Sequence, residues 1–199
     1  MKKFLHLGPG DNTKSQTSNI FATDEWEEVR LDINENANPD ILTSMTDLSM
    51  IDDEEYQGIF SSHNIEHIFP HQVDSTFKEF YRILSADGEL IIICPDLMIV
   101  AKAIVEGNYL KALYQSPAGP IAPIDILFGH RASVAGGNEY MAHKCAFTME
   151  ALLGVLKAAG FGTIVGGTGD FNLYAIAMKP ENLNKLAEQR LRDHLPLGN

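Results

Sequence analysis

The stretch SSHNIEHI, residues 61–68, gathers three side chains that can bind a metal or move a proton: His63, Glu66 and His67. The pattern His-x-x-Glu-His marks one class of zinc protease, whose histidines share one face of a long helix. Here a strand-like run precedes the pattern, Pro70 follows closely, and no later segment offers a third ligand at a recognisable spacing. We therefore predict no metal ligands and expect Glu66 and His67 to join a strand to a helix. A metallohydrolase is the alternative that metal analysis would test.

A second group of residues is suited to holding a nucleotide. Gly8-Pro9-Gly10 follows an apolar run, and glycines let the backbone approach a ligand closely. Asp32 lies 22 residues after Gly10, about the spacing at which an acidic residue holds the two ribose hydroxyls. We predict a cofactor at this turn, with Ile33 beside it. The alternatives are a simple turn and an exposed aspartate at a strand end.

Two further pairs follow predicted strands. Asp47 could accept a hydrogen bond from the amine of adenine while Leu48 packs on the ring, although a turn aspartate would fit as well. Ser62 and His63 follow the fourth strand, so their side chains should line the same crevice. His63 is one candidate catalytic residue there.

Residues 107–142 form a long segment between regular elements and are rich in proline, glycine and aromatic residues. A segment of this length is usually functional. We expect an inserted lobe with little regular structure, which binds substrate through His130, Tyr140 and His143. Histidine has a suitable pKa for taking a proton from an oxygen or nitrogen atom. His143 is the preferred base because it lies where the lobe rejoins the core. The alternative for each histidine is a packing or surface role.

The hydrophobic pattern places these residues on alternating strands and helices. Short apolar or alternating runs predict strands at residues 3–7, 28–33, 41–45, 56–61, 89–94, 161–165 and 173–178. Helical spacing predicts helices at residues 72–84, 97–106, 148–159 and 181–194. The order is typical of a mostly parallel, doubly wound α/β sheet, to which the last two strands add an antiparallel edge. Ligands bind beyond the carboxyl ends of such strands, where the candidate residues lie.

The composition narrows the class of protein. The chain has 199 residues, 45% hydrophobic and 21% charged, which predicts a single domain over residues 1–199. Its net charge of −12, with no basic stripe, argues against nucleic acid as a partner. No apolar run approaches the roughly 20 residues that cross a bilayer, and no signal peptide is evident. We therefore expect no membrane partner and a cytoplasmic location. Cys94 and Cys145 form no disulfide or zinc-ribbon motif.

Residues 3–178 resemble the class I S-adenosylmethionine-dependent methyltransferases, most closely a small bacterial group of predicted methyltransferases of the type 11 kind. The resembling segments read LHLGPG, EVRLDIN, TDLSMIDD, YQGIFSSHNIEHI, FYRILSADGELIIICPDL and FTMEALLGVLKAAGF. The most specific part is Ser-His-x-x-Glu-His followed by Arg82-Ile83-Leu84 and Asp87-Gly88. The resemblance implies a Rossmann-like, three-layer α/β/α fold. It also implies a sheet of seven strands, the last one antiparallel.

The resemblance further implies S-adenosylmethionine as cofactor and S-adenosylhomocysteine as product. It assigns the cofactor's parts by position: the amino-acid end to Gly8 and Gly10, the ribose to Asp32, adenine to Asp47 and Leu48, and the methionine moiety near the sulfonium to Ser62 and His63. The chain departs from the family in three ways. Pro9 stands where many members have a small residue or Cys, the polar segment after Gly10 leaves little room for a first crossover helix, and no cap precedes the first strand.

We predict a methyltransferase that acts on an oxygen or nitrogen atom of a small-molecule or glycan-type acceptor. Two alternatives are a nicotinamide-dependent oxidoreductase, whose fuller Gly-x-Gly-x-x-Gly motif fails here at Thr13, and a non-catalytic module that only binds the cofactor. Apolar residues of the inserted lobe suggest a possible homodimer: Ile121, Ile124, Ile126, Leu127 and Phe128.

Overall fold

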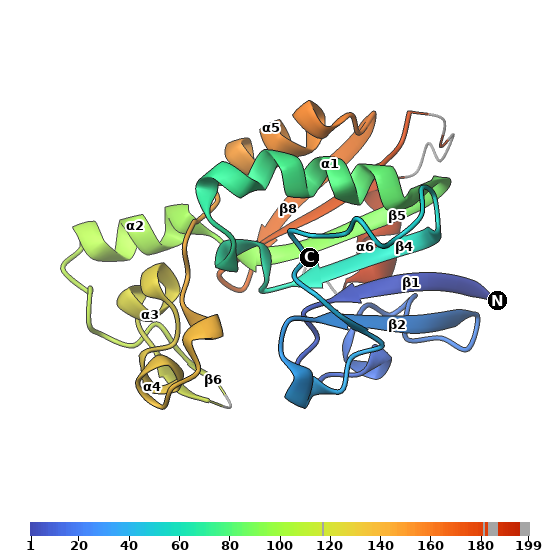
Figure 1. Cartoon of the computed structure of the whole chain (residues 1–199). Coiled ribbons are helices and arrows are strands. Elements are labelled where there is room, and N and C mark those ends of the chain that lie inside the picture. Colours follow the sequence, from blue (N-terminus) through green and yellow to red (C-terminus); the bar gives the residue numbers. More distant parts are fainter. Residues whose placement is uncertain (117, 181, 183–186, 196–199) are drawn as a thin grey trace.

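A computed structural model describes residues 1–116, 118–180, 182 and 187–195 of the chain. Its centre is a seven-stranded sheet with the spatial order β3-β2-β1-β4-β5-β9-β8 (Figure 1). The strands are β1 (Lys2–Leu7), β2 (Trp26–Asp32), β3 (Ile41–Leu42), β4 (Tyr56–Ser62), β5 (Leu84–Pro95), β8 (Thr163–Gly169) and β9 (Asn172–Met178). The pairs among β1 to β5 are parallel, and β9 is antiparallel to both of its neighbours. The predicted sheet of seven strands, with the last one antiparallel, is confirmed.

Two helices cover one face of the sheet, α1 (Val73–Ile83) and α5 (Met149–Ala159) (Figure 1). Their apolar faces pack on the central strands in the larger hydrophobic core, which includes Phe77, Phe80 and Leu152. Helix α5 begins at the cap residue Thr148, whose side chain accepts a hydrogen bond from the backbone of Ala151, and ends at a left-handed glycine. These ends agree with the helix predicted at residues 148–159.

The opposite face is covered in an unusual way. Strands β1 and β2 are joined by a single 3-10 turn, η1 (Lys14–Gln16), and not by a crossover helix. The doubt that the sequence raised about this helix is confirmed. In its place, a second core joins Phe4, Phe21 and Trp26 to Leu191 of α6 (Ala187–His194). A helix was predicted over residues 181–194, of which 181 and 183–186 lie outside the described residues.

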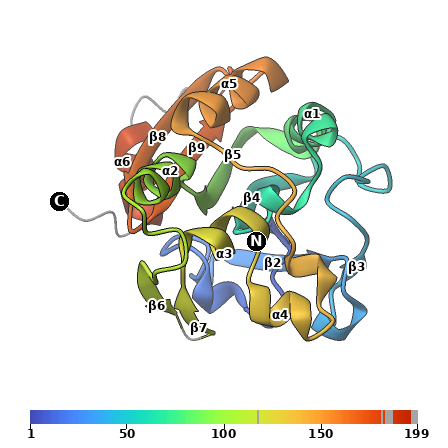
Figure 2. The ribbon, with the colours of Figure 1, turned by 90° about the vertical axis from the view of Figure 1, so that its left-hand side faces the viewer.

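The carboxyl ends of the parallel strands face an inserted lobe, which follows α2 (Leu97–Val105). Figure 2, viewed toward this edge, shows α2, α3 and α4 lying across it. The lobe is more regular than predicted: it contains β6 (Tyr114–Ser116), β7 (Gly119–Ile121), α3 (Pro123–Phe128), α4 (Arg131–Ala135) and η5 (Glu139–Met141).

The lobe has a small core of its own, because Ile121 and Ile126 pack on Val100 of α2. The apolar residues of the lobe that suggest a possible homodimer are mostly packed within the lobe itself. Phe128 is the member that stays widely exposed. Within the described part of the chain, each helix is too short or too polar to span a bilayer.

Candidate functional site

The turn after β1 depends on two glycines in the left-handed backbone region. Gly8 has φ +55° and Gly10 has φ +53°, values that side-chain-bearing residues rarely adopt. The backbone N–H of Gly8 donates to the carbonyl of Leu31 on β2 at 2.8 Å. A Cβ atom at Gly8 would fall 2.1 Å from Oδ1 of Asn64, whereas one at Gly10 would meet no described atom within 4 Å. The chain is therefore tightly packed at Gly8 and open in front of Gly10.

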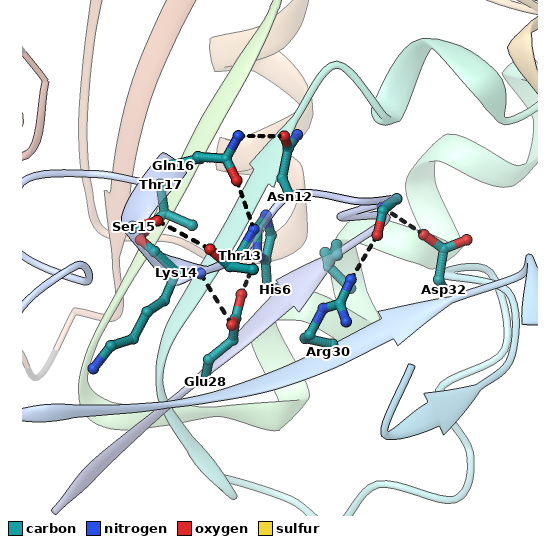
Figure 3. A network of polar contacts seen from close by, with 12 residues as sticks. His6, Asn12, Thr13, Lys14, Ser15, Gln16, Thr17, Glu28, Arg30 and Asp32 are labelled. Carbon is teal, nitrogen blue, oxygen red and sulfur yellow. Dashed lines mark hydrogen bonds and ion pairs between the residues drawn. The ribbon is translucent and has the colours of Figure 1, made fainter. Parts of the chain in front are cut away.

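Asp32, at the carboxyl end of β2, is held against this turn. Its carboxylate accepts from the backbone N–H of Gly10 and from that of Asn34, each at 2.9 Å. From the other side of the turn, Arg30 donates to the carbonyl of Gly10 at 2.6 Å (Figure 3). Each oxygen of a carboxylate has two lone pairs, so Asp32 keeps one on each for a pair of hydroxyl groups. The structure thus brings together the glycine turn and the acidic residue that the sequence paired by spacing.

The end of β4 is tied to the same turn by Asn64. Its side-chain amide donates to the carbonyls of Leu7, at 2.7 Å, and Ser62, at 2.9 Å. Sequence reasoning missed this residue because a single asparagine in a loop has no periodic or motif signal. His63 itself has φ +55°, a strained conformation for a residue with a side chain, and its ring is half exposed. Such outliers gather at functional sites, and this one directly follows the carboxyl end of β4.

The segment with Asp47 and Leu48 is placed by Arg82 of α1. The Arg82 guanidinium donates to the carbonyls of Leu48, at 2.9 Å, and Ile51, at 2.8 Å. Asp47 is exposed, and hydrogen bonds from the side chain and backbone of Ser49 lower its pKa. The Leu48 side chain was expected to lie on an adenine ring, but it is only 1% exposed and belongs to the hydrophobic core. The physical reason is that a leucine next to a turn gains more by burial than by facing solvent.

Glu66 is the most unusual group at this edge. It lies on η3 (Ile65–His67), is 2% exposed, and neither carboxylate oxygen has a hydrogen-bond partner among the described residues. Nδ1 of His63 lies 3.6 Å from Oε1, an ion-pair distance. Burial alone would raise the pKa of Glu66, but the facing rings of His63, His67 and His143 outweigh it and lower that pKa. A charged carboxylate therefore sits in an apolar place with only histidines around it.

Of the three lobe residues predicted to bind substrate, the structure places His143 near the other site residues and His130 and Tyr140 apart from them. His143 lies beside His67, with their rings 4.7 Å apart, and burial is the main cause that lowers its pKa. His63 and His143, predicted as catalytic groups, thus both face Glu66. Tyr140 is 57% exposed on η5, and Nδ1 of His130 bonds to Ser133 at 2.7 Å. No described contact joins His130 or Tyr140 to the other site residues.

The two cysteines are free thiols. Burial raises the pKa of Cys94, which lies in the core, and raises that of Cys145 to about 11. The Cys145 thiol also donates to the carbonyl of Ile65. Both are therefore protonated at neutral pH and are not nucleophiles.

The residues at this edge fit a nucleoside cofactor with a charged amino-acid end. The space in front of Gly10 leaves room for a ligand against the backbone, and the Asp32 carboxylate is bonded to the same turn. These features converge at the carboxyl ends of β1, β2 and β4, where ligands bind in open parallel sheets.

Comparison with known proteins agrees with this arrangement. Residues 5–92 match a family model described as "Methyltransferase domain", a range that includes the glycine turn, Asp32, Asp47 and the end of β4. No curated protein matches the sequence.

Three solved structures share the fold. The PH0226 protein from Pyrococcus horikoshii is 16% identical and matches with a TM-score of 0.61, over 89% of this chain and 81% of that one. A SAM-dependent methyltransferase from Archaeoglobus fulgidus is 13% identical, with a TM-score of 0.56 over 89% and 86%. The 1,6-didemethyltoxoflavin-N1-methyltransferase of Burkholderia thailandensis, solved with 1,6-didemethyltoxoflavin and S-adenosylhomocysteine, is 14% identical, with a TM-score of 0.55 over 89% and 70%.

Proposed function

We propose that this chain, a class I S-adenosylmethionine-dependent methyltransferase of the type 11 family, methylates a small-molecule acceptor. The observation that carries the proposal is the unit formed by Gly10 and Asp32, in which the turn and the carboxylate are bonded together beside open space. The acidic chain, with a net charge of −12, disfavours a nucleic-acid acceptor. The Burkholderia thailandensis enzyme, which acts on a small heterocycle, supports an acceptor of that size.

Each part of the cofactor has a proposed position. The backbone of Gly8, Pro9 and Gly10 would hold the amino-acid end, because the turn exposes backbone groups without side chains in the way. Asp32 would bind the ribose hydroxyls, with Ile33, which is exposed, beside the sugar. The carboxylate of Asp47 would meet the adenine amine, without the Leu48 side chain.

The acceptor would approach from the side of Ser62 and His63. S-adenosylmethionine supplies an activated methyl group when it is bound, so the chain's own task is to align the acceptor and exclude water. An acceptor oxygen or nitrogen atom that received this methyl group would have to give up its proton. We assign that proton to His63, because its ring is half exposed while His143 is less exposed. A glycan-type acceptor and a cytoplasmic location are compatible with this chemistry.

The first test is calorimetric titration with S-adenosylhomocysteine. We expect Asp32→Asn to weaken binding about 10- to 100-fold, as for the loss of hydrogen bonds to a charged group worth about 1.5–3 kcal/mol. Asp24→Ala removes an exposed aspartate away from the turn and should leave the affinity unchanged. If the folded wild-type protein binds NADH and not S-adenosylhomocysteine, the cofactor proposal is wrong.

A further inference from the structure

We propose that the Glu66 carboxylate and the Nε2 atoms of His67 and His143 bind one divalent transition-metal ion of the zinc class. This site was not predicted from the sequence, which argued against metal ligands at His63, Glu66 and His67. The pattern read there paired His63 with His67 along one helix. In the structure, His67 is paired instead with a histidine from the end of the inserted lobe.

The donor atoms are close enough to share one ion. One ligand atom from each of the three residues lies within 4.8 Å of the others. Ligands at zinc distances of 2.0–2.1 Å in a tetrahedral site lie roughly 3.4 Å apart, so small side-chain rotations would close the set. Two histidines and a carboxylate are a donor set that zinc and ferrous iron both accept.

Both histidines have the hydrogen bonds that metal-binding histidines usually have. Nδ1 of His67 lies 3.1 Å from the carbonyl of Ala142, and Nδ1 of His143 lies 2.7 Å from the carbonyl of Ile126. Since a carbonyl only accepts, Nδ1 must carry the proton in each ring. Nε2 is then left with its lone pair free, which is the arrangement that orients a histidine for a metal.

Glu66 supplies an independent observation. A buried polar side chain is nearly always hydrogen-bonded, and a charged one without partners is costly. Both oxygens of Glu66 lack a hydrogen-bond partner among the residues that the structure describes, although the side chain is 2% exposed, and its ion-pair contact with Nδ1 of His63 is long, at 3.6 Å. Glu66 lines a small cavity whose other lining side chains are apolar, among them Pro95, Val100 and Phe147. A cation held with the two histidines would satisfy this carboxylate.

The two segments that carry the ligands are already fixed to each other. The backbone carbonyl of Glu66 accepts from the N–H groups of Lys144, at 2.8 Å, and Cys145, at 3.1 Å, and the Cys145 thiol bonds to Ile65. The ligands are therefore preorganised by backbone contacts on both sides. The metal would also fasten the inserted lobe to the sheet.

Three protein ligands leave one position of a tetrahedral zinc ion free for water or another oxygen. His63 lies beside Glu66 and follows the end of β4, where the acceptor is proposed to approach, so an acceptor oxygen or water could occupy that position. This second part rests on the proposed function, whereas the binding of the metal does not.

Metal binding is tested on the untagged, chelator-treated protein, by titration with Co²⁺ as a visible probe and by elemental analysis after exposure to Zn²⁺. We expect one equivalent of metal in the wild-type protein. Glu66→Gln, His67→Ala and His143→Ala should each weaken binding by at least about 100-fold, more than the 10- to 100-fold typical when only a group that orients a ligand is lost. His71→Ala removes an exposed histidine outside the cluster and should bind like the wild type.

The rival explanation is a cluster in which protonated histidines alone balance Glu66. It predicts that the folded wild-type protein takes up neither Co²⁺ nor Zn²⁺, and that result overturns the proposal. Equal metal binding by wild type and by all three ligand variants overturns it as well. Because His67→Ala could fail to fold, circular dichroism is recorded for every variant, and the nearly isosteric Glu66→Gln carries the comparison if the alanine variants unfold.

The same set of variants distinguishes the metal-site proposal from the cofactor proposal. S-adenosylhomocysteine binding should survive in His143→Ala, which lies outside the Gly10–Asp32 unit, and metal binding should survive in Asp32→Asn. If the wild-type protein binds metal but not S-adenosylhomocysteine, the proposed function is refuted. If it binds S-adenosylhomocysteine but no metal, this inference is refuted.

Discussion

Gly8 and Gly10 have the same backbone conformation and different surroundings, so alanine at each position has a different consequence. Gly8→Ala adds a clash with Asn64 to a strained backbone and should lower the free energy of unfolding by about 3 kcal/mol. Gly10→Ala adds only the strain, about 1–2 kcal/mol. Its methyl group would project into the space assigned to the cofactor, so binding should suffer more than stability.

Urea unfolding of both variants, with calorimetric titration of S-adenosylhomocysteine, separates the two effects. Gly154→Ala is a matched control, because it places a methyl in open space on helix α5 and should be neutral or slightly stabilising. If Gly10→Ala bound the ligand as the wild type does, the space in front of Gly10 would not be the cofactor site.

Single residues also show where sequence reasoning succeeds. Asp32 and Gly10 could be paired from their spacing, because a strand and a turn of ordinary length bring them together. The burial of the Leu48 side chain could not be predicted, since the irregular loop at residues 43–55 has no period that assigns its faces. His143 is distant in sequence from Glu66 and His67, and only the folded lobe brings it to them.

Among the elements, α1 fixes the loop that is expected to meet adenine. Arg82 reaches from this helix to the carbonyls of Leu48 and Ile51 and to the carboxylate of Asp53. We expect Arg82→Ala to loosen the loop, lower the free energy of unfolding by about 1–3 kcal/mol, and weaken S-adenosylhomocysteine binding. Calorimetry and urea unfolding measure the two effects.

Lys78→Ala, an exposed position on the same helix, is the control and should change stability by less than about 0.5 kcal/mol. Unaltered binding by a destabilised Arg82→Ala would mean that the loop plays no part in holding the cofactor.

The regular elements were largely predictable, and the irregular ones were not. Strand β5 and helix α1 could be predicted because their sequence patterns reflect burial. The run of apolar residues in β5 indicates a central strand, and the spacing of Phe77 and Phe80 indicates a helix packed on the sheet. The lobe at residues 107–142 forms short strands and helices that a window of eleven residues cannot resolve. Its elements are stabilised by local caps and by packing on α2, not by a repeating pattern.

At the scale of the whole molecule, stability should fall with acid in two pH ranges. Burial, more than any other cause, lowers the pKa of His6 below its ordinary value of 6.5, despite the Glu28 carboxylate beside it (Figure 3). Below pH 6.5 the unfolded chain therefore binds a proton that the folded chain does not, and the free energy of unfolding decreases.

Glu89 is one of the carboxyl groups that contribute to the second range. Burial would raise its pKa, but hydrogen bonds from His194 and Arg190 prevail and lower it from 4.5. The ionised Glu89 therefore adds to the free energy of unfolding above pH 4.5, and this contribution disappears as the pH falls through the lowered pKa of the folded chain. Urea unfolding from pH 7 to pH 3.5 measures both ranges.

His6→Asn should reduce the loss between pH 6.5 and 5, to which His143 also contributes because burial lowers its pKa as well. His71→Ala, at an exposed histidine, should leave the profile unchanged. A wild-type free energy of unfolding that is constant between pH 7 and pH 5 would contradict the assignment to His6.

The way in which the second face of the sheet is closed has a consequence for synthesis on the ribosome. Phe4, Phe21 and Trp26 are made early, but α6, which covers them, is translated near residue 190. The edge of β5 likewise stays unpaired until β9 has been made, because β9 separates β5 from β8. A nascent chain that ends before residue 172 therefore exposes an aromatic patch and an open strand edge, both of which promote aggregation. Folding of this protein is consequently expected to finish in one late step, with chaperones shielding its earlier half until then.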